Sequence, residues 1–252
     1  VISVFLCVLC VISSISFIVS AKENKEYTSD NFLSVADGII AWKKADNGSE
    51  PDGYLINDKY LENAGTTPGD WYPIALGRLG IQDNNEGYLA VIKDRVEERY
   101  RESGRLSAAK ATEWHRIALA VLAMGGDPTN FGTDENGAPI NLIADGTYDR
   151  GKTTPLGRQG INGWIWGLIT LDSMRYAVPD GAYNTRDDII VEIISKQLSD
   201  GGFALSSDDA DPDITAMAIT ALAPYYNSEK IYSYHRKALS ADESKTVHEV
   251  VD

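Results

Sequence analysis

Four polar residues recur along the sequence where their side chains could do acid–base chemistry or bind a polar ligand. They are Asp70, Glu113, Asn162 and Asp213, spaced 43, 49 and 51 residues apart. Two carboxylates at a suitable separation can cleave a glycosidic bond. The sequence selects no two of the four as an acid–base pair, so a carbohydrate-active site is one alternative among several.

Tryptophans accompany these polar residues. Four of the five tryptophans in the chain are Trp71, Trp114, Trp164 and Trp166, each within a few residues of one of the polar positions. Aromatic walls suit terpenoid chains, cations, corrin rings and sugars. Packing between helices is the commoner role for any single tryptophan, but as a set these four are predicted to contact a ligand.

The segments that follow the polar residues share one template, which predicts four helices. Each has Ala or Gly five residues after its first position, Leu or Ile six after and Leu nine after; the segments are 70–79, 113–122, 162–171 and 213–222. Their helical spacing and long period are typical of repeat proteins, in which each unit buries its apolar face against its neighbours. More polar stretches between them are expected to form outer helices over 30–42, 87–101, 139–144 and 187–198.

The charge of the chain excludes one class of partner. Its formal net charge is −14, with a sequence pI near 4.6. Nucleic-acid binding depends on clustered Lys and Arg side chains that neutralise phosphates. We therefore expect no nucleic-acid partner and no attraction to an anionic membrane surface.

Residues 1–21 are uncharged and mostly apolar, and they end in the small residues Ser20 and Ala21. This pattern predicts a secretory signal peptide, with an uncleaved N-terminal membrane anchor as the alternative. Both cysteines, Cys7 and Cys10, fall in this segment, so a mature chain over 22–252 would have no thiol. We expect a secreted or cell-surface protein that touches the membrane only through an uncleaved N-terminal segment.

The predicted connections are rich in Gly, Pro and Asp over 46–53, 127–137, 145–160 and 200–211. Their carboxylate and carbonyl oxygens could bind calcium, but none has EF-hand spacing. We expect solvent-exposed loops and neither a metal nor another cofactor. A Gly-x-Ser-x-Gly turn and a Walker-type phosphate loop are both missing from the sequence.

Two stretches resemble the prenyltransferase and squalene-cyclase repeat family. The run Gln197-Leu-Ser-Asp-Gly-Gly-Phe203 is similar to the Gly-Gly turn of that repeat, and Asp211-Pro-Asp-Ile-Thr-Ala-Met-Ala218 follows it as the inner helix does. The segments 113–128 and 160–166 look like variants from secreted bacterial members. The resemblance implies an all-α fold, an α/α toroid of inner and outer helices around a central cavity. We expect the toroid domain to occupy residues 22–252, to be truncated at its C-terminus, and to begin a fifth outer helix near 240–242.

The same resemblance implies two chemistries. Class II terpene cyclases of the family protonate an alkene with the middle Asp of an Asp-x-Asp-Asp-Thr-Ala motif, which corresponds here to Asp213 with Asp211 as its neighbour. The acid at the fourth position of that motif is replaced by Ile214. The structural interpretation is that Asp211 caps a helix and Asp213 stabilises its first turn by about 0.3–1 kcal/mol. Zinc-dependent prenyl transfer is disfavoured, because that site needs a Cys ligand and a mature chain would have none.

We therefore predict a non-catalytic toroid that binds a ligand in its central cavity. The vitamin-B12-binding proteins that share this toroid make a hydrophobic or large ring-shaped small molecule a reasonable ligand, with a surface glycan or protein as the other option. The predicted ligand-binding residues are the following: Asp70, Trp71, Glu113, Trp114, Asn162, Trp164 and Trp166. A class II terpene or squalene cyclase that uses Asp213 and Asp211 is the alternative, and a carbohydrate-active toroid is the second alternative.

Overall fold

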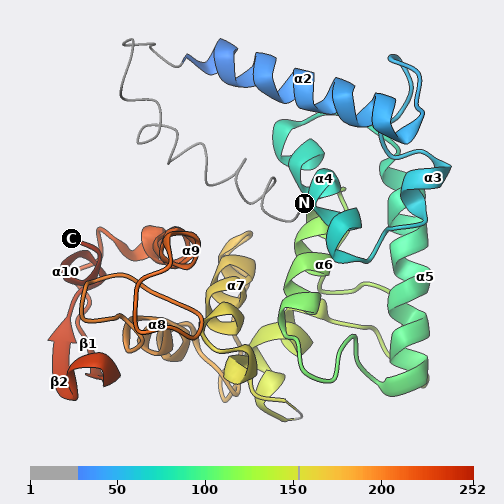
Figure 1. Cartoon of the computed structure of the whole chain (residues 1–252). Coiled ribbons are helices and arrows are strands. Elements are labelled where there is room, and N and C mark those ends of the chain that lie inside the picture. The colour runs from blue at the N-terminus through green and yellow to red at the C-terminus, as the bar shows by residue number, and fades with distance from the viewer. Residues whose placement is uncertain (1–27, 153) are drawn as a thin grey trace. The chain divides into compact units, whose positions relative to one another are not determined.

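A computed structural model describes residues 28–252, apart from residue 153 and the side chain of Lys152. The predicted signal segment, 1–21, lies outside the described residues. The described chain is mostly helical and contains one two-stranded sheet (Figure 1). Between residues 28 and 252, no helix has both the length and the apolar character that a membrane crossing requires.

The chain divides into two compact units. The first contains the described residues up to Val96 together with Ala120–Gly126, and the second contains 97–119 and 127–252. Helices α5 (Asn85–Ser103) and α6 (Thr112–Ala123) contribute residues to both units.

The first unit is built from helices α2 (Ser29–Asn47), α3 (Asp58–Leu61) and α4 (Thr67–Leu79), with the start of α5 and the end of α6. Helix α4 lies directly against α6. A Cβ atom added at Gly77 would lie 2.1 Å from the Ala123 carbonyl oxygen, so only glycine permits this backbone approach. The buried apolar residues of this unit include the following: Leu55, Ile56, Tyr60, Ile74, Leu76, Tyr88, Ile92 and Val121.

The second unit has α7 (Ile161–Asp172) at its centre. This helix packs against α8 (Arg186–Ile194), α9 (Pro212–Leu222) and the 3₁₀ helix η3 (Leu156–Gln159). Besides the end of α5 and the start of α6, the unit contains the π-helix η1, five further short elements and α10: η1 (Ala144–Tyr148), η2 (Arg150–Lys152), η4 (Ala223–Tyr225), β1 (Tyr232–Arg236), η5 (Lys237–Leu239), β2 (Ala241–Lys245) and α10 (Val247–Val251). Its core is aliphatic and includes four isoleucines of α8: Ile189, Ile190, Ile193 and Ile194.

The four template helices are confirmed. Helices α4, α6, α7 and α9 begin within three residues of the predicted starts and end within one residue of the predicted ends. The polar stretches 30–42, 87–101 and 187–198 form α2, α5 and α8, although α8 already ends at Ile194. The repeat template therefore predicts both the kind and the place of these elements.

The prediction of a purely α-helical chain is wrong at its C-terminal part. A fifth helix was expected from about residue 240, but β1 and β2 pair there as an antiparallel hairpin, with Tyr234 opposite Glu243. Tyr232, Tyr234 and Arg236 are buried while the residues between them are exposed, which is the period-two pattern of a strand. A helix does follow, but it begins only at Val247, after the capping residue Thr246.

The predicted outer helix over 139–144 is also misplaced. The Asn141 side-chain oxygen accepts the backbone N–H groups of Ile143 and Ala144, so the chain becomes helical where the prediction ends. The π-helix η1 then spans Ala144–Tyr148. Pro139 lies in an isolated bridge with Thr133, because Pro favours extended backbone at and before its own position.

Candidate functional site

The acidic pair at the start of α9 lies in solvent. The Asp211 carboxylate accepts the backbone N–H groups of Asp213 and Ile214 at 2.8 and 3.0 Å and is the N-cap of the helix. The Asp213 side chain is exposed in the first turn. A proton donor to an alkene must be an acid kept neutral by burial or by neighbouring acids. This geometry fits the structural interpretation, in which Asp211 caps the helix and Asp213 lies in its first turn. It offers neither residue the burial that would keep a carboxyl group neutral.

Removing the cap should weaken α9 without removing any buried group. We expect Asp211→Ala to lower the free energy of unfolding by about 1 kcal/mol, the usual effect of losing an N-cap. Asp211→Asn keeps the acceptor oxygen and should change it much less. Urea denaturation of the three proteins checks this expectation, and equal stabilities for all three would contradict the capping role.

Hydrogen bonds of the Thr215 side chain connect the Gly-Gly turn before α9 to that helix. The Thr215 hydroxyl accepts a hydrogen bond from the Phe203 backbone N–H at 2.9 Å and donates one to the Phe203 carbonyl oxygen at 3.2 Å. The Asp200 carboxylate accepts the N–H groups of Gly202 and Ala210. The residues that carry the family resemblance thus hold a turn and a helix together, which is a structural role.

Asp70 is fully buried in the first unit. Its Oδ1 atom accepts the Tyr88 hydroxyl and the Gly65 backbone N–H, both at 2.7 Å. The neighbouring Trp71 is half-buried. A carboxylate held in this way fixes the loop before α4 to helix α5.

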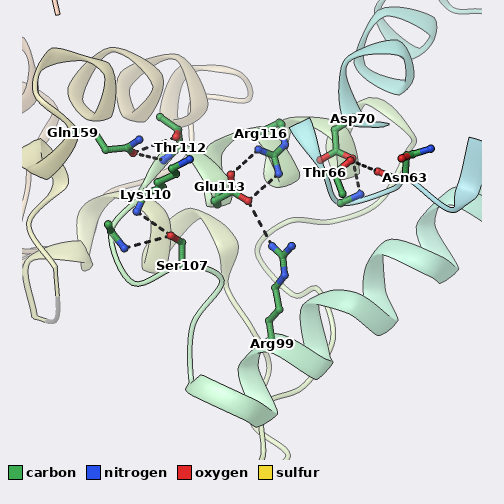
Figure 2. Close-up of polar contacts among 12 residues, drawn as sticks. Asn63, Thr66, Asp70, Arg99, Ser107, Lys110, Thr112, Glu113, Arg116 and Gln159 are labelled. Atoms are coloured by element: carbon green, nitrogen blue, oxygen red, sulfur yellow. Dashed lines mark hydrogen bonds and ion pairs between the residues drawn. The ribbon is translucent and has the colours of Figure 1, made fainter. Parts of the chain in front are cut away.

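Glu113 forms a charge network at the start of α6 (Figure 2). Its carboxylate accepts hydrogen bonds from both terminal nitrogens of Arg116, at 2.8 and 3.0 Å. Its Oε2 atom also lies 3.5 Å from the Nη1 atom of Arg99. Burial tends to raise the pKa of Glu113, but Arg116 and Arg99 outweigh that effect and leave its pKa below the ordinary value. Glu113 is therefore held ionised, which suits a structural ion pair and not a general acid.

Asn162 opens α7 with an amide oxygen that no described residue satisfies. The Oδ1 atom is buried and accepts no hydrogen bond from the part of the chain that the structure describes. Trp166 lies one turn further on the same face and is half-buried. Trp164 points elsewhere: its indole lies so close to Gly157 that a Cβ atom there would be 2.4 Å from the ring nitrogen. Of the predicted residues, Asn162 and Trp166 thus lie on one face at the start of α7, beside an amide oxygen that no described residue satisfies.

Trp114 belongs to a buried polar cluster that sequence reasoning missed. Its indole N–H donates to the Tyr100 hydroxyl at 2.7 Å, and that hydroxyl donates to the Asp145 carboxylate at 2.6 Å. The Arg150 guanidinium lies over the indole, 4.0 Å from the ring centroid. Burial raises the pKa of Tyr100, and the negative charge of the Asp145 carboxylate raises it further. The hydroxyl therefore stays protonated and acts as a donor. The structure places Trp114 in this cluster and not on an open surface.

His115 lies beside the same cluster and is fully buried. Its Nε2 atom is 2.9 Å from the Gly146 carbonyl oxygen and must donate the proton, because a carbonyl only accepts. The Nδ1 atom is then a bare acceptor, without a partner among the described residues. Burial lowers the pKa of His115 to about 3, so the ring is neutral.

The expectation of a solvent-exposed loop over 145–160 is wrong for its first half. Gly146, Thr147, Tyr148 and Arg150 are buried. The burial of this stretch could not be predicted from its composition, because the residues that cover it, Tyr100 and Trp114, are far away in the sequence. A segment of Gly, Asp and Arg without apolar periodicity predicts a loop, and this prediction is the same whether or not other elements bury the segment.

The residues that the structure describes contain no group of three His, Asp or Glu side chains close enough to hold a metal ion. The predicted polar residues also do not act as one set. Asp70 is held by buried hydrogen bonds, Glu113 by an ion pair, and Asp213 is exposed, while the Asn162 amide oxygen has no partner among the described residues. The arrangement suits binding better than acid–base catalysis.

Comparison with known proteins assigns no family. No family model matches the sequence, and no curated protein or solved structure matches the chain. The likeness to the prenyltransferase and squalene-cyclase repeat therefore stays a prediction from the motifs.

Proposed function

We propose that the chain is a non-catalytic ligand-binding domain, secreted or on the cell surface, built as an α/α toroid of the prenyltransferase and squalene-cyclase type. The four template helices and the fastening of the Gly-Gly turn to α9 support this fold. The toroid and its central cavity are inferred from the family resemblance. Export is inferred from residues 1–21.

The observation that carries a binding function is the first turn of α7. Asn162 offers a buried amide oxygen without a partner among the described residues, and Trp166 offers an aromatic face one helical turn away. An unsatisfied buried acceptor is costly unless something donates to it. An amide beside an indole suits a ligand with both apolar faces and hydroxyl or amide donors, such as a sugar or a substituted ring.

The carboxylates support binding over catalysis. Glu113 is ionised within its arginine pair, and Asp213 is exposed behind the Asp211 cap. Neither environment holds a carboxyl group neutral, as the cyclase alternative requires. The carbohydrate-active alternative would still use the same aromatic and amide surface, as a lectin-like site.

Binding can be tested with three probes: a glycan array, cyanocobalamin and squalene. We expect the full chain to bind one of these classes. We expect Trp166→Ala to weaken that binding about tenfold or more, as for loss of an aromatic anchor. Trp42→Ala is the matched control, because Trp42 is 62 % exposed on α2 and belongs to the other unit.

Two results would contradict this proposal. One is an intact protein that binds none of the three probe classes. The other is conversion of squalene to a cyclic product that is lost in Asp213→Asn, which would favour the cyclase alternative.

A further inference from the structure

Arg150 is a buried cation whose donor groups are largely unused. The residue is only 3 % exposed. Its Nη1 atom makes one long contact, 3.5 Å from the Asp145 carbonyl oxygen. Its Nε and Nη2 atoms are buried and find no partner among the residues that the structure describes. A guanidinium has five N–H donors, so most of its hydrogen-bonding capacity is unmet.

The two unused nitrogens form one edge of the guanidinium group. Their N–H bonds point side by side, and this fork matches the spacing of two oxygens on a carboxylate or phosphate group. The Trp114 ring covers one face of the guanidinium at 4.0 Å and restricts its orientation. The fork is therefore held in place before any ligand arrives, which limits the entropy that binding must overcome.

The local charge also favours an anion. Burial lowers the pKa of Arg150 to about 10, so the side chain is still a cation at neutral pH. The Asp145 carboxylate attracts it but also accepts the Tyr100 hydroxyl, and Arg105 adds a second positive charge nearby. A buried water could satisfy the fork, whereas an anion would also add to the compensation that Asp145 gives the buried charge.

Two further buried polar atoms of the same region lack partners among the described residues. They are the Thr147 hydroxyl in η1 and the Nδ1 acceptor of His115. A π-helix such as η1 is rare and often marks a functional site. Here it brings Gly146 so close to α6 that a Cβ atom would lie 2.6 Å from the Trp114 Cβ. The π-turn thus brings the Gly146 backbone against the start of α6, and Arg150, shortly after it, lies over the Trp114 ring.

We propose that the Arg150 fork, with Trp114 behind it, is a binding site for a small oxyanion, either a free ion or the carboxylate or phosphate group of a larger ligand. Neither Arg150 nor Trp114 belongs to the Asn162 and Trp166 pair of the proposed function.

The site can be tested by NMR on the full chain, using the arginine Nε–H signals in a chloride buffer. Sodium phosphate and sodium acetate are the two probes, because they separate tetrahedral from planar oxyanions. We expect the Arg150 Nε–H signal to shift saturably with at least one of them, while the signal of the exposed Arg158 does not. Signals of Arg150 that are unchanged by both anions would overturn the proposal and leave bound water as the partner of the fork.

Substitution provides the second readout, by isothermal titration calorimetry with the same anions. Arg150→Lys keeps the charge but removes the fork, and we expect it to weaken binding at least about tenfold. Arg158→Lys, in the same segment, is the matched control and should bind as the wild type does. Equal affinity in Arg150→Lys and wild type would overturn the proposal. Should Arg150→Lys fail to fold, the wild-type NMR titration, with Arg150 assigned from backbone connectivities, decides alone.

Discussion

Replacing Asp70 by Ala is expected to destabilise the protein by about 3 kcal/mol, because two buried donors lose their acceptor at once. These donors are the Tyr88 hydroxyl and the Gly65 backbone N–H, both 2.7 Å from the same carboxylate oxygen. The side chain has no exposed area, so water does not already share this role. Urea denaturation followed by circular dichroism measures the loss.

The matched control is Asp213→Ala, which alters the same template position in another helix. Asp213 is exposed, so its removal should cost less than about 1 kcal/mol through the helix dipole alone. Asp70→Asn keeps an acceptor oxygen and should fall between the two alanine variants. A similar loss for Asp70→Ala and Asp213→Ala would show that burial does not distinguish the two positions.

The helices of this chain could be predicted from the sequence because their signals are local. The apolar spacing of each template segment lies within ten residues, and the acid–Pro start at Asp211 is a cap that the structure confirms. Such signals depend on hydrogen bonds between near neighbours. For the same reason, α4, α6, α7 and α9 begin close to where the sequence predicts them.

The environment of each template residue could not be predicted in the same way. Asp70 and Asp213 hold equivalent positions, yet one is buried under Tyr88 and the other lies in solvent. The difference comes from residues far away in the sequence, which the local pattern does not encode. Trp114 and Arg150 show the same limit, because their stacking joins a template helix to a segment that the sequence predicts to be a loop.

The hairpin illustrates a third limit, because strand pairing replaces the helix that the sequence predicts from about residue 240. The residues from Tyr232 to Arg236 alternate between buried and exposed, as in a strand, and pair with Ala241–Lys245, where the sequence predicts the start of a helix. The buried Arg236 donates to the Gln197 carbonyl oxygen at 3.1 Å, and Gln197 in turn donates to the Val250 carbonyl oxygen at 2.7 Å. These contacts between distant segments favour the strand over a helix.

The buried His115 should make the stability of the protein fall as the pH drops below about 6.5. In the folded state its pKa is lowered to about 3 by burial, whereas in the unfolded chain it is near the ordinary value of 6.5. Below pH 6.5 only the unfolded state takes up the proton, so protonation favours unfolding. The stability from the neutral ring is complete above pH 6.5 and decreases steadily between pH 6.5 and pH 3. By linkage, the loss at pH 5 relative to pH 8 is about 2 kcal/mol.

The variant His115→Gln isolates this effect, because its amide can still donate to the Gly146 carbonyl oxygen but does not titrate. The free energy of unfolding of wild type and variant is measured by urea denaturation at several pH values from 8 to 5. We expect the wild type to lose about 2 kcal/mol more than the variant over this range. The other two histidines, His235 and His248, are present in both proteins and cancel in the comparison. The Glu113 carboxylate, whose pKa is lowered, loses its contribution only near and below its unfolded value of 4.5, so this pH range separates the two groups. Parallel pH profiles for wild type and variant would show that His115 takes up its proton in the folded protein, and hence that its ring is reached by water.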